Sequence, residues 1–136
     1  MLKLAFLFIS ILLLAGCQST PITGETVTVS SGTYQNITAA ELNSMLKDKD
    51  FLLVNVHIPM GSSISGTDLF IPYDKITVSE NLLQLPAEKD SKIVLYCRSG
   101  RMSEIAAEEL VNLGYTNVWN VSGGMLDWEK AGYPLE

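Results

Sequence analysis

Cysteine, histidine and arginine are scarce in this sequence of 136 residues, which holds two cysteines, one histidine and two arginines. So few thiol and imidazole groups cannot build the ligand cluster that a protein-bound zinc ion requires, so we expect no metal site. Acidic residues outnumber basic ones by 15 to 9, which gives a formal net charge of -6. A surface of this sign repels nucleic acid and anionic lipid, so we expect no nucleic-acid partner and no electrostatic attachment to a membrane.

The first 17 residues have the pattern of an export signal. Lys3 precedes an apolar stretch, Leu4–Leu14, which is shorter than the roughly 20 residues that span a bilayer as a helix. The stretch ends in Leu14-Ala15-Gly16-Cys17, which resembles the lipobox of bacterial lipoprotein signals. That resemblance implies a signal peptide over residues 1–16 and a diacylated Cys17. The protein would then be held in the cell envelope by lipid and face the periplasm or the cell exterior. A plain membrane anchor and an ordinary secretory signal are the alternatives.

The second cysteine, Cys97, is the most informative residue of the chain. Two cysteines in an exported protein first suggest a disulfide. If Cys17 carries a lipid, however, its sulfur cannot form one, and Cys97 is then the only free thiol. Such a thiol is either a buried, inert side chain or a reactive one. Both arginines of the chain, Arg98 and Arg101, follow Cys97 closely, which favours the reactive alternative.

The rest of the chain divides into a linker and one domain. Residues 17–33 are rich in Ser, Thr and Gly and are expected to form a flexible tether, although Thr26–Val29 could instead form an edge strand. In residues 34–136, apolar stretches of strand length alternate with helix patterns. The predicted strands are 51–56, 69–71, 92–96 and 117–121, and the predicted helices are 38–47, 79–85, 103–113 and 125–130. This alternation predicts a parallel α/β sheet with its working site at the carboxyl ends of the strands.

Local signals mark where several of these helices begin and end. Thr38 and Glu41 have the spacing of a capping box at the start of the first helix. Ser79 is expected to cap the second helix, and Gly114 is expected to end the third.

Cys97 follows a predicted strand and opens a loop that leads directly into a helix pattern. A thiol in this place, beside two guanidinium groups, is arranged to ionise and to meet an anion. Backbone N–H groups curled around a sulfur stabilise its negative charge, and Gly100 allows the tight turn that this requires. The segment Cys97–Ser103 is therefore a candidate nucleophile in an anion-binding cradle.

This loop, together with the C-terminal part of the chain, resembles the single-domain rhodaneses. The matching residues are Tyr96-Cys97-Arg98-Ser99-Gly100-Arg101-Met102-Ser103, Gly114-Tyr115 with Val118, Gly123-Gly124-Met125 with Trp128, and Gly132-Tyr133-Pro134. The resemblance covers residues 34–136. It implies an α/β fold with a five-stranded, mainly parallel sheet and helices on both faces. We expect the domain to be a monomer.

The resemblance also implies a sulfurtransferase that works without a cofactor. Cys97 would take a sulfur atom from a small anionic donor such as thiosulfate, become a persulfide, and pass the sulfur to a thiol or to cyanide. Arg98 and Arg101 would bind the donor. The backbone amides that would hold the persulfide belong to Ser99, Gly100, Met102 and Ser103.

Three stretches depart from the family's pattern. Met102 stands where many members have an arginine, and the arginine here is one residue earlier, which leaves the preferred donor open. Asn55-Val56-His57 replaces the usual Asp-x-Arg, so a neutral hydrogen bond is expected in place of an ion pair. His57 is expected to be a loop or core residue, with a catalytic pair between His57 and Cys97 as the alternative. Residues 62–67 replace the usual Gly-His-Ile-Pro-Gly.

Two other functions remain open at this point. Phosphatases and arsenate reductases related to this fold have an arginine six residues after the cysteine, where this chain has Ser103, and their loop is one residue longer. A non-catalytic module that binds a partner at the envelope is the second alternative. The intact Cys97 with both arginines beside it argues against such a module.

Overall fold

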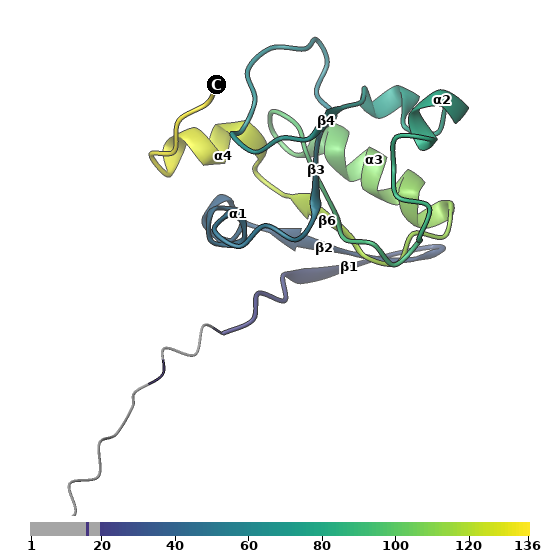
Figure 1. The fold of residues 1–136 in the computed structure, drawn as a ribbon, viewed down its shortest axis with the longest axis horizontal. Helices are drawn as coiled ribbons and strands as arrows, with labels where there is room; N and C mark the ends of the chain where they lie inside the picture. The colour runs from purple at the N-terminus through teal and green to yellow at the C-terminus, as the bar shows by residue number, and fades with distance from the viewer. Residues whose placement is uncertain (1–15, 17–19) are drawn as a thin grey trace, which may run out of the picture.

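A single six-stranded sheet forms the centre of the computed structural model, which describes Gly16 and residues 20–136 (Figure 1). The strands lie in the order β1-β2-β6-β5-β3-β4. Every neighbouring pair is parallel except β1 and β2, which are antiparallel. The strands are β1 Glu25–Val29, β2 Gly32–Ile37, β3 Leu52–Asn55, β4 Leu69–Phe70, β5 Ile93–Tyr96 and β6 Val118–Val121.

Helices cover both faces of this sheet, which confirms the predicted rhodanese-like α/β architecture. Helices α1 Ala39–Leu46 and α4 Gly124–Lys130 pack on one face. Helix α3 Arg101–Asn112 packs on the other, near the short helices η1 Tyr73–Lys75 and α2 Ser79–Leu82. Because successive strand residues point to opposite faces, the buried strands β5 and β6 supply side chains to both cores.

Two strands of the six-stranded sheet, β1 and β2, are not among the segments predicted as strands, and β1 lies within the expected tether. Residues Thr26–Val29 alternate threonine with valine, a pattern of β-branched residues that suits an edge strand. Val27 and Val29 pack against the core below α3, and Val27 lies opposite Tyr34 in the hairpin with β2. The edge-strand alternative is therefore what the structure shows for this segment.

The capping box at the first helix is confirmed. The side chain of Thr38 accepts a hydrogen bond from the N–H of Glu41 at 3.2 Å, and the Glu41 carboxylate accepts one from the N–H of Thr38 at 2.7 Å. Two other helix starts differ from the prediction. Ser79 is the first residue of α2 rather than its cap, since Val78 holds that position. Helix α3 starts at Arg101 rather than Ser103, because the turn at Gly100 lets the helix begin at once.

Within residues 20–136, no helix is both long enough and apolar enough to cross a membrane. Apart from Gly16, the predicted signal peptide lies outside the described residues, as does Cys17.

Candidate active site around Cys97

Cys97 lies directly after β5, which runs between β3 and β6 in the middle of the sheet. Its side chain is 1% exposed and belongs to the core on the α3 face. The preceding residue, Tyr96, points to the opposite face, where its hydroxyl accepts a hydrogen bond from the N–H of Ile64 at 3.0 Å and bonds the hydroxyl of Thr67 at 2.7 Å. Burial raises the pKa of Tyr96, so its hydroxyl remains neutral at neutral pH. The strand that carries Cys97 is thus fixed on both sides.

Two hydrogen-bond donors point at the sulfur of Cys97. The backbone N–H of Gly100 lies 3.1 Å from Sγ, and the hydroxyl oxygen of Ser103 lies 3.5 Å from it. The same hydroxyl lies 3.0 Å from the carbonyl oxygen of Gly100; having one hydrogen, it donates to one of these acceptors at a time. Both donors are buried. Donors aimed at a buried sulfur stabilise a negative charge on that atom.

The path of the loop around the sulfur requires glycine at position 100. Gly100 has a φ of 104°, in the left-handed region that L side chains avoid. A Cβ at this position would also overlap the carbonyl oxygen of Ser122, which follows β6. Glycine avoids both the backbone strain and the overlap with Ser122, and this allows the N–H of Gly100 to point at Sγ.

A second glycine, Gly124, allows the start of helix α4 to pack closely against the backbone of the Cys97 loop. The N–H groups of Met125 and Leu126, in the first turn of α4, donate to the carbonyl oxygens of Cys97 at 2.9 Å and of Arg98 at 3.0 Å. These amides have no partner within their own helix, so the loop carbonyls satisfy them. A Cβ at Gly124 would lie 2.5 Å from the Cys97 oxygen and 2.6 Å from the Arg98 oxygen, so the contact requires glycine.

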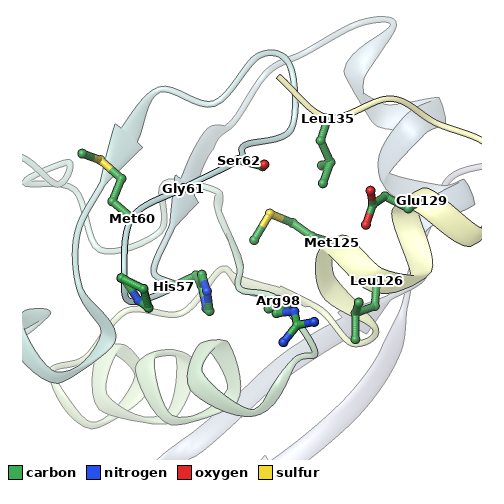
Figure 2. A pocket seen from close by; sticks show the side chains of 10 residues that line it. His57, Met60, Gly61, Ser62, Arg98, Met125, Leu126, Glu129 and Leu135 are labelled. Carbon is green, nitrogen blue, oxygen red and sulfur yellow. The ribbon is translucent and has the colours of Figure 1, made fainter.

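A pocket of about 330 Å³ adjoins this loop (Figure 2). Its walls come from the loop after β3, from Arg98, from α4 and from the C-terminal segment. Cys97 does not line the pocket, but it is linked to it through its neighbour Arg98 and through Met125, whose N–H bonds its carbonyl. About half of the lining residues have apolar side chains, and three have groups able to carry charge; the lining residues are His57, Pro59, Met60, Gly61, Ser62, Arg98, Met125, Leu126, Glu129 and Leu135.

The wall formed by the loop after β3 is held by Asn55. This residue is 3% exposed. Its Oδ1 accepts a hydrogen bond from the backbone N–H of His57 at 3.0 Å, and its Nδ2 donates to the carbonyl oxygen of Ser62 at 3.3 Å. The neutral hydrogen bond expected in place of an ion pair is therefore present, with the backbone of His57 as the donor. In the described part of the chain, His57 makes no hydrogen bond to Cys97, which favours a loop histidine over a catalytic pair.

The structure brings together most of the residues that the sequence singled out. Both arginines are exposed; Arg98 lines the pocket, whereas Arg101 begins α3 and is not part of the lining. Ser99 is exposed, and Met102 packs partly buried against the core under α3. Across residues 20–136 and Gly16, no three His, Cys, Asp or Glu side chains gather as a metal site would need.

Sequence reasoning missed two features of the site. The side chain of Ser103 contacts Sγ, whereas the sequence pattern points only to its amide; the available signal is the position of Ser103 in the first turn of α3. The apolar wall formed by Met125 and Leu126 depends on the docking of α4 against the loop, which no local pattern reports.

The site combines a buried cysteine at the carboxyl end of a central parallel strand with a tight loop and a helix, which places a thiol where α/β domains commonly carry their working site. Comparison with known families identifies the domain further. The family model for the rhodanese-like domain matches residues 38–131, and the chain belongs to that family, which includes enzymes.

Individual relatives agree with this family. Over 107 residues the chain is 32% identical to the tRNA uridine(34) hydroxylase of Escherichia coli, a match that covers 74% of this chain and 30% of that protein. A rhodanese-related protein from Thermoplasma volcanium is 29% identical, with a TM-score of 0.62 over 76% of this chain and 98% of its own. A rhodanese-like domain protein from Staphylococcus aureus is also 29% identical, with a TM-score of 0.57 over 68% of this chain and 89% of its own.

Proposed function

We propose that this protein is a sulfurtransferase in which Cys97 carries the transferred sulfur as a persulfide. The thiolate of Cys97 attacks the outer sulfur of a donor such as thiosulfate. The sulfur–sulfur bond of the donor breaks, and sulfite leaves with its electron pair. An acceptor, a thiol or cyanide, then attacks the outer sulfur of the persulfide and releases Cys97 as a thiolate.

The observation that carries this proposal is the pair of donors on Sγ, the Gly100 amide and the Ser103 hydroxyl, beside a pocket lined by Arg98. Thiolate and persulfide are both anionic, so the same donors serve both states. The backbone amides of Ser99, Gly100, Met102 and Ser103 hold the persulfide, and the first turn of α3 adds its dipole. No cofactor or metal takes part in these steps.

Arg98→Ala is expected to raise the KM for thiosulfate about fivefold, because an exposed ion pair contributes up to about 1 kcal/mol. Arg101→Ala is the matched comparison: the proposal gives Arg101 a part in donor binding, but its exposed place outside the pocket lining predicts a smaller increase. Steady-state kinetics with thiosulfate and cyanide measure both values. An unchanged KM in Arg98→Ala would show that this guanidinium does not touch the donor.

A cyanolysis assay separates this proposal from the two alternatives. A sulfurtransferase supplied with thiosulfate and cyanide produces thiocyanate. A cysteine-dependent phosphatase instead releases phosphate from an aryl phosphate, and a non-catalytic binding module does neither. The absence of thiocyanate formation at any protein concentration would contradict the proposal.

The activity named for the Escherichia coli relatives is not proposed for this chain. The chain spans about 30% of the length of those proteins, so most of what they contain has no counterpart in the match. A net charge of -6 also disfavours a tRNA substrate, since its phosphates would be repelled.

We further propose that the domain is anchored in the cell envelope through acyl chains on Cys17 and faces away from the cytoplasm. The lipobox-like Leu14-Ala15-Gly16-Cys17 supports this, and the acidic charge leaves lipid as the source of membrane affinity. In a bacterial host, Cys17→Ser is expected to move the protein from the membrane fraction to the soluble fraction or to leave it unprocessed. A wild-type protein found only in the soluble fraction would contradict the anchor.

A further inference from the structure

The pocket beside Cys97 has more room and a different charge pattern than thiosulfate or cyanide requires. Its volume of about 330 Å³ lies within the range of about 300–1,000 Å³ typical of sites for small organic molecules. Much of its wall is apolar, formed by Met60, Met125, Leu126 and Leu135. An apolar wall does not contribute to the binding of a small inorganic anion, but it can pack against the carbon skeleton of an organic molecule.

Two opposite charges line the same pocket. Arg98 belongs to the Cys97 loop, and Glu129 lies on α4, one turn after Met125. Figure 2 shows the guanidinium group below and the carboxylate above, with Met125 between them. Among the described residues, neither side chain takes part in an ion pair. Both charges are therefore available to a ligand.

The presence of Glu129 in the pocket is not explained by the binding of an anionic sulfur donor. A carboxylate in the pocket repels thiosulfate and cyanide, so it weakens the binding of both anions. It attracts an ammonium group, however, and Arg98 attracts a carboxylate. A molecule with both groups would satisfy both side chains and would place its short carbon chain along the apolar wall.

We infer that the sulfur acceptor is a small thiol of the α-amino acid class, such as cysteine, which binds with its carboxylate on Arg98 and its ammonium group on Glu129. This inference rests on the proposed function and names the substrate of its second half-reaction. Sulfite has left by then, so Arg98 is free to bind the acceptor. The acceptor sulfur forms a bond to the outer sulfur of the persulfide, the bond between that sulfur and Cys97 breaks, and Cys97 leaves as a thiolate. The thiol proton moves to the outer sulfur, so the product is a free amino acid persulfide and no other reactant is needed.

The test compares two acceptors on protein that has first been loaded with thiosulfate and freed of excess donor. Cysteine carries both charges, whereas 3-mercaptopropionate is the same skeleton without the amino group. The rate constant for loss of the persulfide is measured with each thiol on the wild type, on Glu129→Gln and on Glu80→Gln. Glu80 is exposed on α2, across the domain from α4, and provides the same change of charge outside the pocket.

Glu129→Gln is expected to lower the ratio of the cysteine rate to the 3-mercaptopropionate rate by about two- to fivefold relative to the wild type, within the range for an exposed ion pair. The intrinsic reactivities of the two thiols cancel, because the same pair is compared on each protein. Glu80→Gln is expected to keep the wild-type ratio.

Cyanide distinguishes a failure of this inference from a failure of the proposed function. If the wild type forms a persulfide that cyanide removes, and Glu129→Gln has the same ratio as Glu80→Gln, the aminothiol inference is overturned and the sulfurtransferase stands. If the wild type forms no persulfide, both fall together.

Discussion

Cys97→Ser is expected to reduce thiocyanate formation to the rate measured without protein. A serine hydroxyl is not ionised at neutral pH and does not form a stable bond to a sulfane sulfur, so no intermediate can carry the sulfur. The measurement is thiocyanate produced from thiosulfate and cyanide at saturating concentrations of both.

The same variant is expected to keep its fold. Serine is slightly smaller than cysteine, and its hydroxyl would meet the Gly100 N–H and the Ser103 side chain that now face Sγ. The replaced side chain is buried, so a cost of about 1 kcal/mol in the free energy of unfolding is expected. Thermal unfolding followed by circular dichroism checks this. Thiocyanate production that survives in a folded Cys97→Ser protein would refute the role of Cys97.

Gly100→Ala is expected to combine a large loss of stability with a near-complete loss of activity. Alanine at a φ of 104° is strained, and its Cβ would overlap the Ser122 carbonyl oxygen, so the loop must move away from β6. We expect the free energy of unfolding to fall by about 3–5 kcal/mol, as for other severe backbone conflicts. The displaced loop would no longer direct the residue-100 amide at Sγ. Urea unfolding and the cyanolysis rate measure the two effects.

Gly114→Ala is the matched control for this change. Gly114 follows α3 with a φ of 92°, but a Cβ there meets no atom within 4 Å. Only the backbone strain of about 1–2 kcal/mol applies, and activity should persist wherever the protein is folded. If both variants lost the same stability and kept the same activity, the close contact between Gly100 and Ser122 would have no functional role.

Several elements, including the strand before Cys97, were predictable because their signals are local. Thr38 and Glu41 define a helix start within four residues, and the apolar residues before Cys97 define a strand followed by a tight loop. The position of Cys97 at the carboxyl end of a parallel strand then follows from the alternation of strands and helices. The same reasoning placed Arg98 and Gly100 beside the sulfur.

Strand β1 was predictable only as an alternative to a tether, and the pocket was not predictable, because each depends on packing that a local pattern does not report. The composition of residues 25–29 is typical of a linker. They form a strand because the side chains of Val27 and Val29 pack against the core. The Leu135 wall exists because the C-terminal segment pairs with the loop after β3: Ser63 and Glu136 exchange N–H···O bonds of 3.0 Å and 2.9 Å. Neither segment has a local sequence pattern that identifies the residues against which it packs.

The most direct test of sulfur transfer through Cys97 is the intact mass of the purified domain before and after incubation with thiosulfate, followed by peptide mapping. We predict a gain of one sulfur atom, located on the peptide that contains Cys97 and removed by cyanide with release of one thiocyanate per protein. An unchanged mass, or added sulfur on any other residue, would contradict the account.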